Sequence, residues 1–329
     1  MREETRMKRL TAGLLTGLTL CLWLGAGMAA QSRELKFSTP TPEPHIMTKS
    51  AHHLADAFAQ AGTGDTIAVF PVNKLGDVPT VLSLLQSGAV ELAVVPVGDL
   101  ANRDPSFLAW FLPYQFDTLA EAGAAADSEP ARDMLARLDS QGIKGLGYVF
   151  PGQRHLLSKQ PITSAGEISG LKVRAFPNDI FNSWWRELGA APTALPLPEI
   201  MPSLVTGVID AVDVDIDIVS GLQMQKQAPY LILTNHMAFP AAILASARWW
   251  NSLSPEEQSG FEEMVAETQD WAIMTQTEGE AALLDRLAAD GAQIGTIDDP
   301  ALQAAGETVR NAFLDRDPLI RRFYEANQN

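Results

Sequence analysis

Arg174 is the residue of this sequence best placed to bind a small anion. It belongs to the run Gly-Leu-Lys-Val-Arg-Ala-Phe-Pro at residues 170–177, which predicts a turn followed by a short strand. In a strand, Leu171 and Val173 lie on one face, and Lys172 and Arg174 lie on the other. The strand therefore carries a guanidinium toward its carboxyl end, where α/β proteins usually bind small ligands. A guanidinium matches a carboxylate with two parallel N–H donors, although a surface arginine on an edge strand would show the same pattern.

A second basic group and a row of acids follow other predicted strands. Arg154 comes just after a predicted strand at 143–150. Asp213, Asp215 and Asp217 alternate with apolar residues, which predicts a strand with one polar face. Such a face can be exposed to solvent or can hold a hard cation, and we expect the exposed face.

Four more residues complete the set of candidate ligand contacts. His45 ends a proline-rich loop and is either a plain turn residue or a contact. Trp184 lies in a predicted helix and either packs in the core or covers a ligand. Asn178 and Asn235 are the other two members of the set.

Signals for an enzyme are missing from the sequence. There is no nucleophile elbow, no HExxH, no phosphate-binding loop and no GxGxxG. The single cysteine, Cys21, lies in the N-terminal segment, so the exported chain would have no disulfide and no thiol chemistry. The formal net charge of -16 argues against nucleic acid as a partner. We therefore expect no enzyme, no metal and no cofactor.

The N-terminus has the pattern of a signal peptide. A basic start is followed by an apolar run from Leu10 to Leu24 and by small residues that allow cleavage near Ala29 or Ala30. The apolar run is short for a membrane span. We therefore expect residues 1–30 to be removed on export to the periplasm.

The remaining pattern is that of an α/β protein. Strands are predicted at 34–39, 66–70 and 90–97 with helices between them, which indicates a parallel sheet with right-handed crossovers. The segment from Ser254-Pro255-Glu256-Glu257 to Asp290 predicts one helix of about 35 residues, because serine, proline and acids favour a helix start. A helix of that length is long enough to span two domains.

Taken in order, several short motifs resemble those of one protein family. They are Lys74-Leu75-Gly76-Asp77, Leu84–Ala93, Leu112-Pro113-Tyr114-Gln115-Phe116, Gly152-Gln153-Arg154-His155, Gly170-Leu171-Lys172-Val173-Arg174, Leu204–Ala211 and Leu233-Thr234-Asn235-His236. The series resembles the periplasmic solute-binding proteins of tripartite ATP-independent periplasmic (TRAP) transporters, the DctP-like group, over residues 34 to 325.

The resemblance implies a two-domain periplasmic-binding-protein-like fold with a ligand cleft between the domains and a long interdomain helix. It implies that Arg174 grips the carboxylate of a small organic acid and that Arg154 adds a second contact. Asp213 takes a position that is glutamate in many members, and Val214 replaces an amide or indole there. The resemblance also implies TRAP membrane subunits as partners, and we expect a monomer.

We expect domain I to comprise residues 31–151 and 240–279, and domain II residues 152–239 and 280–329. Two other functions stay open from the sequence. The first is a receptor of the same fold that presents its ligand to a sensor kinase, and the second is a secreted hydrolase.

Overall fold

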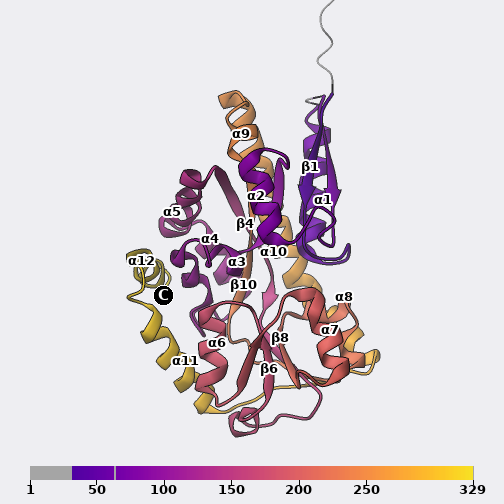
Figure 1. The fold of residues 1–329 in the computed structure, drawn as a ribbon, viewed down its shortest axis with the longest axis vertical. Coiled ribbons are helices and arrows are strands. Elements are labelled where there is room, and N and C mark those ends of the chain that lie inside the picture. Colours follow the sequence, from indigo (N-terminus) through magenta and orange to yellow (C-terminus); the bar gives the residue numbers. More distant parts are fainter. Residues whose placement is uncertain (1–31, 63, 329) are drawn as a thin grey trace, which may run out of the picture. The chain divides into compact units, whose positions relative to one another are not determined.

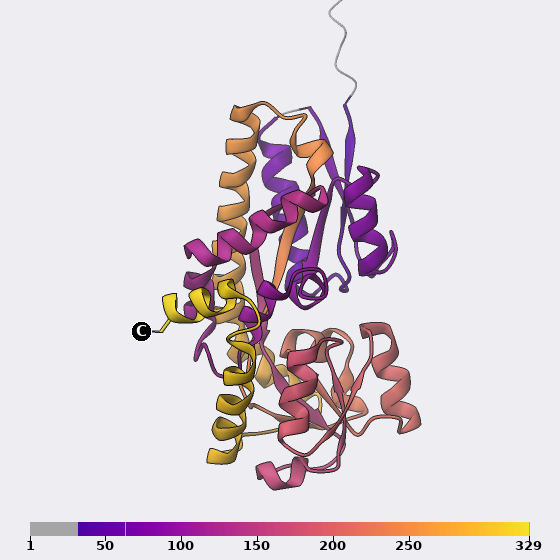
Figure 2. The same ribbon diagram turned by 60° about the vertical axis from the view of Figure 1, so that its left-hand side comes forward.

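The computed structural model describes residues 32–62 and 64–328, so the predicted signal peptide and Cys21 lie outside the described residues. Residues from Glu34 onward form one compact unit that contains two β-sheets. We call the part built on the first sheet lobe A and the part built on the second sheet lobe B. Figures 1 and 2 show lobe A above lobe B. Within the described residues, no helix is both long and apolar enough to cross a membrane.

Lobe A is built on a five-stranded sheet in the order β2-β1-β3-β10-β4. Its strands are β1 (Glu34–Ser38), β2 (Thr66–Phe70), β3 (Leu92–Pro96), β4 (Ile143–Gln153) and β10 (Ala238–Ser246). The first three are parallel, as the sequence predicts, whereas β10 is antiparallel to both of its neighbours. The connecting helices α1 (Ile46–Gln60) and α2 (Val78–Ser87) begin at side-chain caps from His45 and Asp77.

Lobe B is built on a six-stranded sheet in the order β11-β9-β5-β8-β6-β7. Its strands are β5 (His155–Ser158), β6 (Lys172–Ala175), β7 (Ala191–Ala194), β8 (Ala211–Val214), β9 (Tyr230–Ile232) and β11 (Gln293–Gly295). The helices between them are α6 (Asp179–Glu187), α7 (Leu197–Thr206) and α8 (Ile216–Gly221). The predicted arginine strand is β6, at whose carboxyl end Arg174 lies.

The long helix α10 spans Pro255–Ala289, 35 residues, which confirms the predicted length. Ser254 and Glu257 form a reciprocal capping box at its start. The helix packs against α1 and β4 of lobe A and against α8 and β11 of lobe B, and Figure 2 shows it running along both lobes.

The remaining helices are all shorter than α10. They are α3 (Val97–Leu100), η1 (Pro105–Phe111), α4 (Leu119–Ala126), α5 (Glu129–Arg137), η2 (Leu138–Gln141), η3 (Ala165–Ile168), η4 (Met224–Lys226), α9 (Ala247–Trp250), α11 (Pro300–Phe313) and α12 (Pro318–Ala326). Helix α11 packs on α6 of lobe B, but α12 packs on η1 and α5 of lobe A. The domain division stays a proposal, and this packing favours assigning the last helix to domain I rather than to domain II.

Two extended segments cross between the lobes beside each other. One joins β4 to β5 at Arg154, and the other joins β9 to β10 through residues 233–237. The Arg154 amide donates to the Met237 carbonyl at 2.7 Å, and the His236 amide donates to the Arg154 carbonyl at 3.2 Å. The backbone of Arg154 is therefore fixed at the junction of the lobes.

The prediction of one continuous strand with an exposed acidic face at 208–219 is wrong. The strand β8 ends at Val214, and Asp215 caps the helix α8 that follows. Asp213, Asp215 and Asp217 are all buried, with exposed fractions of 0%, 3% and 7%. Their partners come from distant parts of the chain. An alternation of polar and apolar residues carries no information about such partners, so it could not predict that the aspartates are buried.

Gly147 allows the close packing of β4 on α10, and its replacement provides a test of that packing. A Cβ atom at Gly147 would lie 2.8 Å from Cδ of Gln269 and 2.9 Å from Cγ1 of Val265, both on α10. Gln269 also accepts a hydrogen bond from the Tyr148 amide at 2.5 Å, so it cannot move away freely. We expect Gly147→Ala to lower the free energy of unfolding by about 1–3 kcal/mol, measured by urea denaturation.

Gly260, which lies on α10 itself, is the matched control. A Cβ atom there would meet nothing within 4 Å, so Gly260→Ala should raise the free energy of unfolding by about 0.5–1 kcal/mol through helix propensity. Equal effects of the two substitutions would contradict the packing argument.

Candidate functional site

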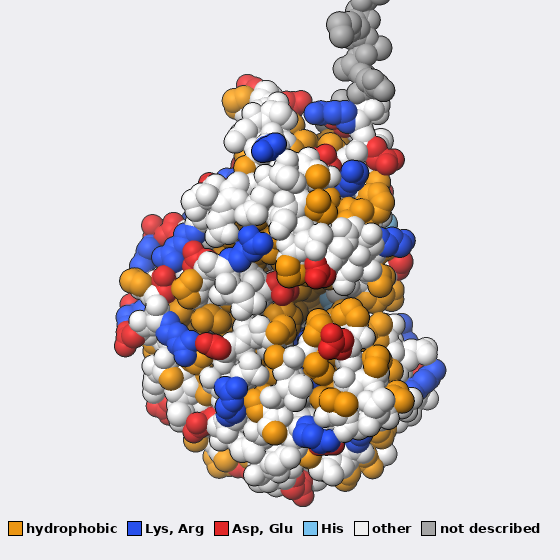
Figure 3. All heavy atoms as spheres, viewed as in Figure 1, with side chains coloured by type: hydrophobic (Ala, Val, Ile, Leu, Met, Phe, Trp, Pro, Cys, Tyr) orange, Lys and Arg blue, Asp and Glu red, His pale blue; other side chains and the backbone are white. Residues whose placement is uncertain are grey.

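A cavity of about 480 Å³ opens where lobe A faces lobe B. We call it the interlobe cleft. Its lobe A wall comes from the loops after β1, β2 and β3, and its lobe B wall comes from the ends of β6 and β8 and the start of α7. More than half of its lining residues are apolar. Figure 3 shows hydrophobic and acidic side chains around this opening.

Arg154 lies at the base of the interlobe cleft, and its guanidinium is fully engaged by protein acceptors. Nε donates to Oδ1 of Asp213 at 2.6 Å, and Nη1 donates to Oδ2 of Asp215 at 3.3 Å. Nη2 donates to the Asp213 carbonyl. The group also lies over the ring of Phe239, 4.4 Å from its centroid. Only 2% of the surface of Arg154 is exposed. Its positive charge is balanced within the protein by Asp213 and Asp215.

Two buried carboxylates carry the opposite charge. Burial alone would raise the pKa of Asp213, but Arg154 and the hydrogen bonds from His236 and Trp185 outweigh it and hold that pKa below its ordinary value. Burial likewise opposes ionisation of Asp215, yet His45 and Arg154 lower its pKa to about 2. Both groups are therefore ionised at neutral pH.

His45 lines the cleft and connects α1 to this cluster. Its Nδ1 accepts a hydrogen bond from the Met47 amide at 3.2 Å, which leaves Nε2 to carry the proton. Nε2 lies 3.6 Å from Oδ1 of Asp215. The imidazole therefore directs an N–H from lobe A toward a carboxylate of lobe B.

Arg174 is the second guanidinium of the interlobe cleft, and it has no carboxylate partner within the described residues. Nε donates to the Leu195 carbonyl at 2.9 Å, and Nη1 donates to the Asp213 carbonyl at 3.3 Å. Nη2 makes no hydrogen bond to the described protein. Burial, together with the nearby charge of Arg154, lowers the pKa of Arg174 to about 9. A buried cation with free donors is the group to which an anion would bind.

Asp99 also lines the cleft, although no sequence pattern predicted it as a ligand contact. It lies on α3, directly after β3, and lines the cleft on the lobe A side. Among the described residues its carboxylate has no hydrogen-bond or ion-pair partner. Burial raises its pKa to about 7, while Arg174 opposes the rise and Asp77 adds to it. Perturbed carboxyl groups of this kind are frequent at functional sites.

Four of the sequence-predicted contacts do not line the interlobe cleft, and Asp213, described above, is one of them. Asn178 caps α6 and donates to the Gly98 carbonyl at 3.4 Å. Trp184 is fully buried and stacks on the ring of His236, with centroids 5.5 Å apart. Asn235 is exposed on the crossing segment, with a left-handed φ of 45°. Arg174, Arg154 and His45 do line the cleft, and Asp213 contacts both arginines without lining it.

The row of aspartates is not arranged as a cation site. Asp213 faces Arg154, Asp215 caps α8, and Asp217 accepts from the Ile46 amide at 2.7 Å. Among the described residues, no group of three or more His, Cys, Asp or Glu side chains could hold a metal ion.

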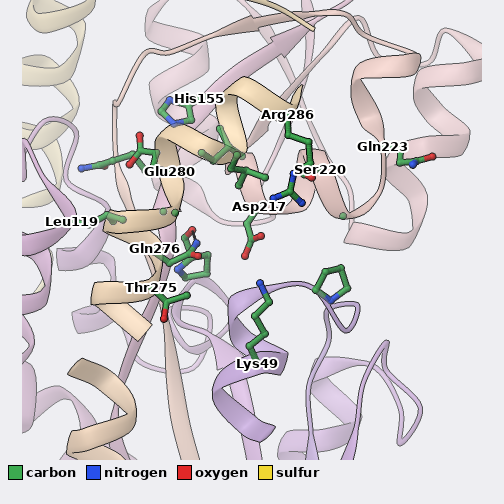
Figure 4. A pocket seen from close by; sticks show the side chains of 18 of the residues that line it. Lys49, Leu119, His155, Asp217, Ser220, Gln223, Thr275, Gln276, Glu280 and Arg286 are labelled. Carbon is green, nitrogen blue, oxygen red and sulfur yellow. Dashed lines mark hydrogen bonds between the residues drawn. The ribbon is translucent and has the colours of Figure 1, made fainter. Parts of the chain in front are cut away.

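A second cavity, of about 440 Å³, lies beside α10 and α8. In Figure 4, Lys49 and Arg286 point toward Asp217. Both cations are exposed, so water solvates them and they need no ligand charge. The interlobe cleft, with its buried and unpaired guanidinium, is therefore the better ligand site of the two.

Comparisons with known proteins agree with this geometry. Residues 37–315 match the family described as bacterial extracellular solute-binding protein, family 7 (DctP). The chain is similar to the 2,3-diketo-L-gulonate-binding periplasmic protein of Escherichia coli K12, at 25% identity over 89% of this chain and 90% of the relative. It is also similar to the C4-dicarboxylate-binding periplasmic protein of Rhodobacter capsulatus, at 25% identity over 79% and 83%.

The fold matches a solved TRAP periplasmic solute-binding protein from Haemophilus influenzae with bound L-gulonate. The TM-score is 0.85 at 22% identity, and the match covers 90% of this chain and 99% of the other. The two-domain α/β fold with a cleft between the domains is thereby confirmed, and the matched proteins are solute-binding proteins rather than enzymes.

The two arginines should differ sharply in their effect on stability. Arg154→Met leaves Asp213 and Asp215 buried without their cation, which typically costs about 3–5 kcal/mol. Arg174→Met removes a buried charge that has no ionic partner, so the free energy of unfolding should fall by less than about 1 kcal/mol or rise. Urea denaturation of both variants measures the difference, and a larger loss for Arg174→Met would contradict it.

Asp99 should make stability depend on pH. An unfolded aspartate titrates near about pH 4, so between about pH 4 and 7 the folded chain holds a proton that the unfolded chain has lost. The contribution of Asp99 to stability therefore falls as the pH rises. Asp99→Asn should raise the melting temperature relative to the parent more at about pH 8 than at about pH 5.

Glu199→Gln is the control, because Glu199 lines the same cleft but is exposed. The difference in melting temperature between Glu199→Gln and the parent should be nearly the same at the two pH values. A pH-independent difference for Asp99→Asn would show that burial does not perturb this carboxyl group.

Proposed function

The chain belongs to the DctP family of bacterial extracellular solute-binding proteins, and we propose that it is the receptor that binds a small organic acid in the periplasm for a TRAP transporter. The acid lies in the interlobe cleft with its carboxylate against Arg174. The membrane subunits of the transporter receive it from there. The N-terminal basic and apolar pattern supports export.

The state of Arg174 is the observation that carries this proposal. Arg174 is 4% exposed, it lines the interlobe cleft, and the described protein supplies it with carbonyl oxygens but no carboxylate. A bound carboxylate would supply the missing charge and accept the free N–H donors. A charge-assisted pair of that kind is stronger in a site shielded from water.

The relatives support the same chemistry. The names of the matched proteins give 2,3-diketo-L-gulonate, C4-dicarboxylates and L-gulonate as their ligands, and each of these is an organic acid. We assign different roles to the two arginines, because Arg154 is already paired with two carboxylates. Arg174 is the ligand contact, and Arg154 holds the base of the cleft and places the Asp213 carbonyl against Arg174.

The binding role of Arg174 can be tested with the organic acid that gives the largest thermal shift in a screen of purified protein. Arg174→Ala should weaken its binding by about 2–5 kcal/mol, which is roughly 30- to 5000-fold in Kd. Arg174→Lys should not restore binding, because an ammonium lacks the planar pair of donors. Isothermal titration calorimetry gives the affinities, and circular dichroism checks that each variant is folded. Binding by folded Arg174→Ala within about threefold of the parent would refute the assignment.

A further inference from the structure

The cations of the interlobe cleft lie on one wall. Both lining arginines come from lobe B or from the crossing segment, whereas lobe A contributes Asp77 and Asp99 and no lysine or arginine. The lobe B side also contributes Asp215, which pairs with Arg154, and the exposed Glu199. A ligand between the walls therefore meets the unpaired Arg174 on the lobe B side and carboxylates without a cation on the lobe A side.

The two lobe A carboxylates are not equivalent. Asp77 caps α2 and accepts from the Thr80 amide at 3.0 Å. The side chain of Asp99 caps no helix within the described residues. The amides at the end of α3 donate to the backbone carbonyl of Asp99 and not to its carboxylate. Asp99 is also partly shielded from water. Its carboxylate is therefore the acceptor on this wall that is free for a ligand.

Arg174 and Asp99 form a matched pair of unsatisfied charges. Both line the same cleft, and the charge of Arg174 acts on the ionisation of Asp99. Among the described residues the guanidinium of Arg174 is bound by the carbonyls of Leu195 and Asp213 and forms no ion pair with Asp99. An acid with no cationic group would satisfy Arg174 but would place a second negative charge beside Asp99. A molecule with both an acid and an ammonium group would satisfy both residues.

The rest of the cleft limits how many hydroxyl groups a ligand can carry. Its lining is largely proline, valine, leucine, isoleucine and phenylalanine. Apart from Arg174 and Asp99, Asn73 is the lining polar side chain that is partly shielded from water and has no hydrogen bond within the described protein. A hydroxyl buried without a partner loses binding energy, so an apolar body suits this cleft better than a sugar acid.

We infer that the ligand is a zwitterionic acid whose carboxylate binds Arg174 and whose ammonium group binds Asp99. This inference rests on the proposed function and narrows its substrate class. Asp99 is then the residue that selects amino-bearing acids. Together with Arg174 across the cleft, it fixes the orientation of the ligand.

A direct contact between Asp99 and Arg174 on closure of the lobes is the competing explanation. Such a latch would strengthen the binding of every ligand equally, because it would act on the closed form and not on a ligand group. The two explanations differ in whether the effect of Asp99 depends on the amino group of the ligand.

The test uses ligand sets that differ in one group. The probes are β-alanine, γ-aminobutyrate and δ-aminovalerate, each compared with the ω-hydroxy acid and the unsubstituted acid of the same length. Calorimetric titrations of the parent, Asp99→Asn, Arg174→Ala and Glu199→Gln are made at about pH 8, where Asp99 is mostly ionised. Glu199→Gln removes the same charge from an exposed position of the same cleft.

The parent should bind at least one amino acid about tenfold or more tightly than its hydroxy and unsubstituted counterparts. Asp99→Asn should reduce that preference at least about fivefold, whereas Glu199→Gln should change it less than about twofold. An equal loss for all three kinds of acid indicates the latch and overturns the inference. An equal loss of preference in Glu199→Gln also overturns it, because the effect would then come from the general field of the cleft.

The outcome separates this inference from the proposed function. If no amino acid in the sets binds, or if each binds no better than its unsubstituted counterpart, the zwitterion inference is wrong. The proposed function still stands in that case when Arg174→Ala abolishes the binding of the acids found by the screen. Retained binding of those acids by folded Arg174→Ala refutes the assignment of Arg174 as the carboxylate contact, on which both the proposed site and this inference rest.

Discussion

A guanidinium buried where two segments cross between lobes needs counter-charges, and Arg154 obtains them from Asp213 and Asp215. The ion cluster joins the crossing segment to β8 and to the start of α8, and His45 brings α1 of lobe A to one of these carboxylates, Asp215. Removing one member leaves the others charged and shielded from water. The relative placement of the cleft walls therefore depends on this cluster.

The two arginines of the cleft show how surroundings, and not residue type, decide a role. Arg154 meets two carboxylates and a carbonyl, so little of its capacity is left for a ligand. Arg174 meets carbonyls alone. A buried charge left without a counter-ion lowers the stability of the protein, and such groups persist where binding or chemistry requires them. Asp99 is the acidic counterpart of Arg174 in the same cleft.

Local signals predicted much of this fold, and long-range contacts explain where they failed. The ends of α10 were predictable because Ser254, Pro255 and Glu257 act on neighbouring backbone groups. Asp213 and its neighbours were expected to face solvent because their partner, Arg154, is 59 and 61 residues away. Asp99 gave no signal, since it follows an apolar run and its importance comes from lining the same cleft as Arg174, a residue of the other lobe. The family motifs predicted Arg174 as a ligand contact, but they did not predict Asp99 on the opposite wall of the cleft.

The position of β10 has a consequence for how the protein folds. This strand lies between β3 and β4 in lobe A, yet it is made after β5 to β9 of lobe B. Until residues 238–246 are available, β3 and β4 each keep an unpaired edge, and the sheet cannot close around its core. Pairings between such distant segments slow folding and prolong the exposure of apolar strands. Lobe A therefore cannot complete its sheet until residues 238–246 have been synthesised.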